Sequence, residues 1–259
     1  MNQKLIQHGL ILVASTALIW FGFSQIDYMS VFKVRQTTAN LEEDLGDMLW
    51  RSIKKTEEVI YKDSVCDPVK EIFLKLADAN GLDSDKIQLH VIDKNEVNAF
   101  AMPGNHIVVY TGLIRDCKNP DQLAGVLGHE IAHLEKGHIM KKLAREIGLT
   151  VLVSASGGSE SPRKILKSLT SSAYDRGLES EADETAVEYL HKANIDPRHM
   201  ADFMFAMGND APSALYWIST HPHPKERAEE ILDIVKKDKK DYKPSLSTQE
   251  WQSLRKALP

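Results

Sequence analysis

His129-Glu130-Ile131-Ala132-His133 is the most informative stretch of this chain. It has the pattern H-E-x-x-H, in which two histidines four residues apart lie on the same face of an α-helix. Both imidazoles can then bind one zinc ion, and the glutamate between them can take a proton from a water on that ion. The pattern predicts a zinc-dependent hydrolytic site, provided that the segment is helical and that a third ligand exists.

The sequence before this motif predicts the start of a helix. Asn119 can cap it, Pro120 suits the first helical position, and Gln122 can complete a capping exchange. Apolar residues then recur at helical spacing, at Leu123, Val126, Leu127, Ile131 and Leu134. We expect this helix to weaken near Gly137.

The third ligand does not come from the residues directly after the motif. Metzincins need a glycine and a histidine at the positions that Lys136 and Ile139 occupy here, so that class is excluded. On a continuous helix His138 would lie about 140° away from His133, and we therefore do not expect it to bind the same ion directly.

A di-iron site is a competing interpretation of the same residues. Glu130-x-x-His133 and Glu135-x-x-His138 both have the E-x-x-H pattern. Di-iron bundles take their two E-x-x-H motifs from two different helices that face each other. Both motifs would lie on one helix here, so we reject this interpretation.

A carboxylate from a second helix can supply the third ligand. Glu179 and Asp183 are four residues apart in a helix-like stretch that runs to about Lys192, so they share a face, and Glu181 points roughly the opposite way. One of the pair can bind zinc while the other holds a ligand histidine. These residues alone leave the choice open, and acidic residues are also usual at a solvated helix N-terminus.

Four stretches together resemble a known family. They are Asn98–Gly104 with Val108–Leu113, His129–His133 with His138, Arg176 with Glu179-x-x-Ala182-Asp183, and Thr220-His221-Pro222 with Arg227. In the order and spacing of these stretches over residues 67–235, the chain resembles the HtpX-like zinc metallopeptidases (gluzincins), a family that includes CAAX prenyl endopeptidases and mitochondrial inner-membrane quality-control proteases. Within this family it resembles single-anchor bacterial envelope members. One departure is Asp175, where relatives often have serine.

The resemblance implies a fold and a role for each site residue. The fold would be an α+β, mainly helical zincin with a small β-sheet. Glu179 would be the third zinc ligand, beside His129 and His133, and Asp183 would hold a ligand histidine in its tautomer. Glu130 would be the general base, and His221 would stabilise the reacting carbonyl oxygen or act as a plug ligand.

Two functions follow as alternatives. The first is an endopeptidase with one zinc ion per chain, which hydrolyses peptide bonds in unfolded or damaged envelope proteins. The second is a latent, chaperone-like or regulatory zinc-binding protein, whose site is plugged by His221. An intact Glu130 favours the enzyme, and turnover would separate the two.

A sheet edge is expected beside the zinc helix. Residues 87–92 mostly alternate as a strand does, Pro103-Gly104-Asn105 has turn residues, and residues 107–111 form a second strand pattern. Such an edge could pair with an extended substrate peptide through backbone hydrogen bonds. A hairpin with Phe100 and Val109 in the core would fit as well. The candidate substrate-binding residues are Asn98, Ala99, Phe100 and Ala101.

The N-terminus predicts a membrane anchor. Leu5 to Phe23 is almost entirely apolar, and a helix over this stretch would rise about 28 Å, close to the thickness of a hydrocarbon core. No A-x-A-like cleavage site follows, which favours an uncleaved anchor over a cleaved signal peptide and a secreted or periplasmic product. Flanking basic residues do not decide the orientation. A short leader before a large domain favours a single-pass protein of the bacterial inner membrane, with its catalytic domain in the periplasm.

Composition and spacing predict three regions. These are an anchor at 1–26, a helical linker at 27–66 and a metallopeptidase domain at 67–259; an amphipathic helix at 38–61 is expected to pack on the domain. Ser154–Ser172, rich in glycine and serine, is a candidate flap over the site. The net charge of −5 argues against a nucleic-acid partner, which leaves polypeptide substrates and the membrane. Cys66 and Cys117 permit one disulfide or two free thiols.

Overall fold

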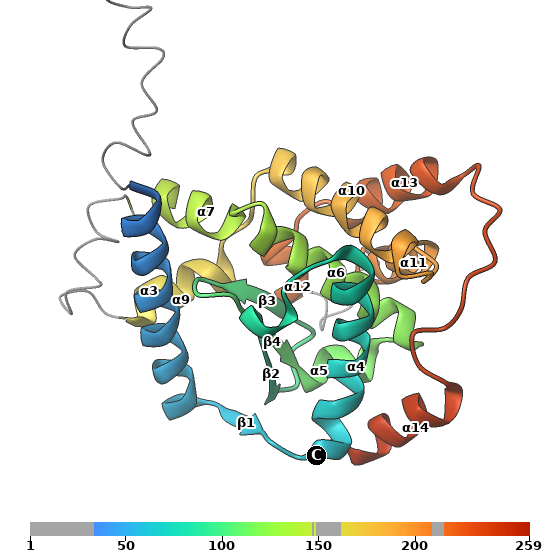
Figure 1. Ribbon diagram of the computed structural model, residues 1–259, viewed down its shortest axis with the longest axis horizontal. Coiled ribbons are helices and arrows are strands. Elements are labelled where there is room, and N and C mark those ends of the chain that lie inside the picture. Colours follow the sequence, from blue (N-terminus) through green and yellow to red (C-terminus); the bar gives the residue numbers. More distant parts are fainter. Residues whose placement is uncertain (1–33, 147, 149–161, 209–214) are drawn as a thin grey trace, which may run out of the picture. The chain divides into compact units, whose positions relative to one another are not determined.

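The computed structural model describes residues 34–146, 148, 162–208 and 215–259, with side chains from residue 39 onward (Figure 1). Contacts divide the chain into Met1–Leu41 and Glu42–Pro259, and the sheet and the site lie in the second unit. It is mainly helical with one small mixed sheet, as expected. The helices are α3 (Val34–Thr56), α4 (Asp63–Asn80), the 3-10 helix η1 (Ser84–Lys86), α5 (Thr111–Asp116), α6 (Pro120–Glu135), α7 (His138–Glu146), α9 (Pro162–Ser171), α10 (Arg176–Lys192), α11 (Arg198–Met207), α12 (Leu215–Thr220), α13 (Pro224–Val235) and α14 (Thr248–Ala257).

The sheet has the strand order β1-β2-β4-β3. Its strands are β1 (Glu58–Ile60), β2 (Gln88–Asp93), β3 (Ala99–Met102) and β4 (His106–Tyr110). The central pair β2–β4 is parallel, whereas β1 and β3 run antiparallel to their neighbours. Gly104 and Asn105 turn the β3–β4 hairpin with φ of 72° and 60°, as the turn residues predicted. Three-residue β1 was not predicted, because so short a strand shows no alternation.

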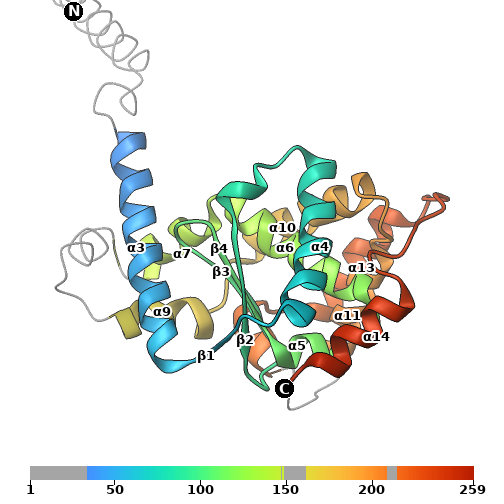
Figure 2. The ribbon, with the colours of Figure 1, turned by 60° about the horizontal axis from the view of Figure 1, so that its bottom comes forward.

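Helix α6 carries the H-E-x-x-H motif through the core. It packs against α10, α11 and α4 and against β3, and Figures 1 and 2 show it enclosed by these elements. Asn119 caps the helix by accepting from Gln122 N–H at 2.9 Å, as predicted. The helix ends at Glu135, and Gly137 takes φ of 65° before α7 begins. The predicted weakening near Gly137 is therefore a full break.

Helix α3 packs on the domain along one face. Its side chains Leu45, Leu49 and Ile53 are fully buried, so the predicted amphipathic helix covers the core. A Cβ at Gly46 would lie 2.2 Å from the carbonyl oxygen of Pro103, so the helix touches the β3–β4 turn where only glycine fits. The helix ends at Thr56, and β1 follows where the pattern predicted helix up to residue 61.

Two expected regions lie wholly or partly outside the described residues. The candidate anchor from Leu5 to Phe23 is one; in the part of the chain that the structure describes, no helix has both the length and the apolar composition of a membrane span. The candidate flap is described only from Pro162, where α9 forms with Ile165 and Leu169 buried. That part is a packed helix, and the rest of the candidate flap lies outside the described residues.

Both cysteines are free thiols. Cys66 donates to the carbonyl oxygen of Ile60 at 3.2 Å, and Cys117 is fully buried. Burial raises the pKa of both thiols.

Candidate functional site

Four side chains from three parts of the chain meet in the core. His129 and His133 come from α6, Glu179 from α10, and His221 directly follows α12. One potential ligand atom from each lies within 4.8 Å of the others, and all four residues are buried. The Nε2 atoms of His129 and His133 are 2.9 Å apart, and His133 Nε2 is 3.2 Å from Glu179 Oε1. The structure thus brings together His129, His133, Glu179 and His221, which could hold a metal ion and which we call the ligand group.

The electrostatics of this group suit metal binding. Burial lowers the pKa of His133 to about 3 and that of His221 to about 4, so both rings are neutral and keep a free lone pair. Burial alone would raise the pKa of Glu179, but the charge of Arg227 and hydrogen bonds with His133 and His221 outweigh it and hold that pKa well below its ordinary value. Two neutral imidazoles and an ionised carboxylate are the protonation states in which these side chains bind metal.

Glu130 lies beside the group and remains free to exchange a proton. Its Oε2 accepts from Ala101 N–H at 2.9 Å, while Oε1 is 3.4 Å from His221 Nε2 and forms no hydrogen bond with any described residue. Burial, and then the negative charge of Glu179, raise the pKa of Glu130 well above its ordinary value. A carboxylate of raised pKa is a better proton acceptor near neutral pH.

The predicted substrate edge lies next to Glu130. Asn98 accepts from Tyr110 N–H toward β4, and backbone groups alternate along a strand, so the Ala101 N–H points outward to Glu130. The side chains of Asn98, Ala99, Phe100 and Ala101 are all buried, and α9 packs against β3. This edge therefore borders the site but is covered in the structure.

Asp183 lies behind His129. Its Oδ1 is 2.9 Å from His129 Nδ1, on the ring edge opposite the ligand group. Arg227 donates to both oxygens of Asp183, at 2.6 and 2.7 Å, and also pairs with Glu179. Arg227 belongs to the resemblance but received no role from the sequence. The structure shows it as the cation that neutralises two buried carboxylates.

Sequence comparison identifies the family to which this site belongs. The chain matches peptidase family M48 over residues 66–235. It belongs to peptidase family M48. The motif-based resemblance is confirmed, and the matched region contains every site residue described above.

Several relatives of this M48 chain carry names that describe proteases. It is 30% identical to "Metalloendopeptidase OMA1, mitochondrial" of Bos taurus over 72% of this chain and 40% of that protein. It is 24% identical to the "Beta-barrel assembly-enhancing protease" of Yersinia pestis over 81% of this chain and 46% of that protein. It is 29% identical to "Metalloprotease YcaL" of Escherichia coli over 60% of this chain and 65% of that protein. The chain thus spans less than two thirds of each of these relatives.

In this M48 chain His138 contacts His133 on the side of its ring that faces away from the ligand group. Its Nδ1 lies 2.9 Å from His133 Nδ1, and its Nε2 lies 3.2 Å from Glu181 Oε2. The expectation that His138 is not in the ligand group agrees with the structure, but the premise of one continuous helix is wrong, because α7 starts at His138. Glu181 does point away from the ligand group, but it contacts His138, which in turn contacts His133.

Sequence patterns gave no sign of two further neighbours of the M48 site. The Tyr174 ring stacks on His133 with centroids 4.1 Å apart, and the ammonium of Lys142 lies 4.1 Å from the Tyr174 centroid. Lys142 also donates to the carbonyl oxygen of Leu169, and its burial lowers its pKa to about 8. Lysines are mostly exposed in proteins, so the sequence of α7 gave no reason to expect a buried Lys142.

Proposed function

We propose that this chain is a zinc-dependent endopeptidase. The single observation that carries the proposal is the buried group of His129, His133 and Glu179 with the partly unpaired carboxylate of Glu130 beside it. Membership of peptidase family M48 supports the same conclusion. We further propose that the domain is a zincin and that it comprises residues 67–259.

The spacing of the group suits zinc. Tetrahedral zinc with ligand bonds of about 2.0–2.1 Å places neighbouring ligand atoms roughly 3.3 Å apart. Five distances among the side chains of His129, His133, Glu179 and His221 range from 2.9 to 3.8 Å, with Oε1 or Oε2 of Glu179 as its ligand atom, and the whole group lies within 4.8 Å. Imidazole nitrogens and a carboxylate oxygen are also the ligands that zinc takes in proteins. One zinc ion per chain is therefore the cofactor that we assign.

The residues around the group can carry out hydrolysis. When bound, zinc supplies a Lewis acid that polarises a peptide carbonyl and makes water more acidic. Glu130 Oε1 takes the proton of the attacking water and later gives it to the leaving amine. Asp183 keeps the hydrogen on His129 Nδ1, which leaves Nε2 as the ligand atom. His221 Nε2 faces Glu130 and can donate to the reacting carbonyl oxygen once its ring turns out of the ligand group.

One observation favours a latent form as the second candidate. His221 Nδ1 lies 3.2 Å from His129 Nε2 and 3.1 Å from Glu179 Oε1, so it occupies the place that a water would need. Trp217 stacks on the His221 ring at 4.2 Å between centroids and stabilises this position. In this form the chain holds zinc with a plugged site and seldom cleaves. We propose that the plugged arrangement is the resting state of the peptidase.

The proposed substrates are unfolded or damaged polypeptides of the cell envelope. Backbone pairing along β3, which requires α9 to move off this edge, would read little side-chain identity, and one relative is named a beta-barrel assembly-enhancing protease. We place the chain in the bacterial inner membrane through its N-terminal segment, with the catalytic domain in the periplasm. The apolar stretch from Leu5 to Phe23 supports this placement, and the net charge of −5 supports the absence of a nucleic-acid partner. A periplasmic protein with a cleaved leader is the alternative.

Casein cleavage tests the function. The full chain in detergent with one equivalent of zinc should cleave casein, and Glu130→Gln should lower the rate by about 10²–10⁴-fold without loss of zinc. Glu135→Gln is the matched control, because Glu135 is exposed on the same helix. A chelator should stop cleavage, and His221→Ala should raise it if the plug is the resting state. Equal rates for Glu130→Gln and wild type would refute the assigned base. A folded, zinc-loaded wild-type chain that cleaves no casein would refute an active peptidase and favour the latent form.

A further inference from the structure

The edge of the sheet opposite β3 is left partly unpaired. β1 pairs with β2 only from Glu58↔Asp93 to Ile60↔Val91, after which the chain turns into α4. β2 continues for three more residues, Gln88 to His90, with no described strand on that side. A sheet edge of this kind can accept another extended chain.

The backbone of Leu89 faces this open side. Gln88 N–H donates to Asn105 O at 2.8 Å, in the direction of β4. Because N–H and C=O groups alternate between the two sides of a strand, those of Leu89 point away from β4, toward the line of β1. No residue of β1 stands opposite Leu89, and its backbone makes no hydrogen bond outside the sheet within the described chain. Leu89 therefore offers one donor and one acceptor to an added strand.

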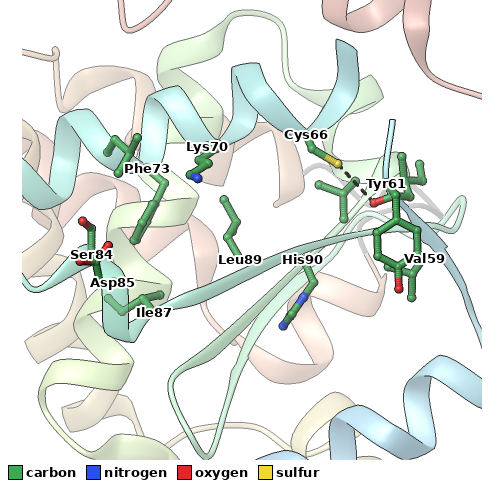
Figure 3. Close-up of a pocket in the computed structure, with 13 residues that line it drawn as sticks. Val59, Tyr61, Cys66, Lys70, Phe73, Ser84, Asp85, Ile87, Leu89 and His90 are labelled. Atoms are coloured by element: carbon green, nitrogen blue, oxygen red, sulfur yellow. Dashed lines mark hydrogen bonds between the residues drawn. The ribbon is translucent and has the colours of Figure 1, made fainter. Parts of the chain in front are cut away.

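A cavity of about 620 Å³ lies over this stretch. Figure 3 shows Phe73 and Lys70 of α4 on one side of it, and Leu89 of β2 with Ile87 just before this strand on the other, with Tyr61 at one end. Its volume is within the usual range for ligand pockets, and most of its lining is apolar. An added strand would find both a backbone partner and room for apolar side chains.

Lys70 gives the cavity a charge preference. Its side chain is exposed and lines the cavity, and no described residue forms an ion pair or hydrogen bond with it. Lysines of comparable exposure nearby are paired: Lys75 with Glu71 and Lys86 with Asp83. The carboxylate of Asp85 also lines the cavity, but Figure 3 shows it beside Ser84, away from Lys70. The part of the cavity at Lys70 therefore suits a carboxylate on the bound chain.

We propose that the free edge of β2 at Leu89 is a second polypeptide-binding site, which takes an extended segment with apolar residues and an acidic side chain. The segment continues the line of β1, exchanges backbone hydrogen bonds with Leu89, buries apolar side chains against Phe73, and places its carboxylate at Lys70. β3, beside Glu130, is at the other edge of the sheet, so this site is separate from the catalytic centre. It would hold a polypeptide while another segment is cleaved, but binding itself does not require peptidase activity.

Peptide binding to the full-length Glu130→Gln chain tests the proposal. The probe is a blocked eight-residue peptide in which valine alternates with threonine and one threonine is replaced by glutamate, and its Kd is measured by fluorescence anisotropy. Lys70→Glu should weaken this peptide at least about threefold and should strengthen a matched peptide with lysine in place of glutamate. Lys239→Glu is the control, because Lys239 is exposed after α13 and its change alters the net charge equally.

Two further measurements address strand pairing itself. Leu89→Pro removes the N–H at the open edge together with the leucine side chain that lines the cavity, and it should weaken binding, while the β2–β4 bonds of Gln88 and His90 remain. Since this variant can fail to fold, N-methylated probes are tested on the unmodified site. Methylation of one alternate set of peptide nitrogens should abolish binding, and methylation of the other set should not. Binding that responds to neither Lys70→Glu nor N-methylation would overturn the proposal, whether or not the chain cleaves casein.

Discussion

The hydrogen on His133 Nδ1 determines which ring nitrogen faces the ligand group. With Nε2 turned to the other ligand atoms, Nδ1–H donates to His138 Nδ1 at 2.9 Å. His138 must then carry its own hydrogen on Nε2, which lies 3.2 Å from Glu181 Oε2. The carboxylate of Glu181 thus fixes the tautomer of His138, and His138 fixes that of His133.

A substitution at His138 should therefore weaken metal binding without removing a ligand. We expect His138→Ala to lower zinc affinity about 10–100-fold, because the His133 ring loses the acceptor that holds it. His138→Gln can still accept a hydrogen bond and should recover part of the loss. Competition with a chromophoric chelator measures both, with His191→Gln, an exposed histidine at the end of α10, as the control. Unchanged affinity in His138→Ala would refute this role.

Residue spacing predicted which pairs of side chains lie on one helix face, but not what surrounds them. Helical periodicity alone placed His129 with His133 and Glu179 with Asp183, because each pair is four residues apart on one helix. It could not tell which carboxylate faces the metal, since that depends on how α6 and α10 pack. Tyr174 and Lys142 were missed because one lies before α10 and the other on α7, and only tertiary packing brings them to His133.

At the scale of elements, the contact between α3 and the β3–β4 turn can be tested at Gly46. Alanine normally stabilises a helix relative to glycine, but here its Cβ would lie 2.2 Å from Pro103 O. We expect Gly46→Ala to lower the free energy of unfolding by about 1–3 kcal/mol. Gly177→Ala in α10 meets no atom within 4 Å and should be neutral or stabilising by up to about 1 kcal/mol. Urea unfolding measures the free energy of unfolding of both variants. A Gly46→Ala variant more stable than wild type would contradict the close contact between Gly46 and Pro103.

The packing of α3 on β2 and β4 should make stability depend on pH. Trp50 stacks on His90 at 3.7 Å between centroids, and His90 Nε2 lies 2.9 Å from His106 Nδ1. Burial, then His106 and Lys54, lower the pKa of His90 to about 3, whereas in the unfolded chain it is about 6.5. Burial also lowers the pKa of His106, against the opposite effect of Asp47.

Between these values the unfolded state binds a proton that the folded state does not. Stability is therefore fully present above about pH 6.5 and is lost as the pH falls toward about 3. We expect the free energy of unfolding to decrease from pH 7 to pH 5. In His90→Phe, which keeps a ring against Trp50, the decrease should be smaller. Equal slopes for the variant and wild type, measured by urea unfolding, would show that His90 is protonated in the folded chain.

Helices and strands were predictable where a pattern had room to repeat. The helix of the motif, the two longer strands and the β3–β4 turn follow from caps, alternation and turn residues. Short β1 and the parallel pairing of β2 with β4 did not follow, because pairing direction depends on the intervening chain path and not on the strand sequences. The break at Gly137 was foreseen as a weakening, but its effect on the direction of His138 was not.

At the scale of the whole molecule, several charged groups lie together in the core. Glu130, Glu179, Asp183 and Arg227 are all buried, together with the histidines of the ligand group. Burying charges costs free energy unless they are paired, and Arg227 pairs with only two of the three carboxylates. A bound divalent cation would offset the remaining negative charge and couple metal binding to folding.

Zinc content of the full chain tests the central claim most directly. Purified in detergent, dialysed against excess zinc and analysed by mass spectrometry for metals, the wild-type chain should contain one zinc ion. Glu130→Gln and Glu184→Gln should contain the same amount, since Glu184 is exposed on α10. Glu179→Gln should lose most of it, because an amide is a poor substitute for a carboxylate ligand. A folded wild-type chain without zinc, or a Glu179→Gln variant that retains a full equivalent, would contradict the account.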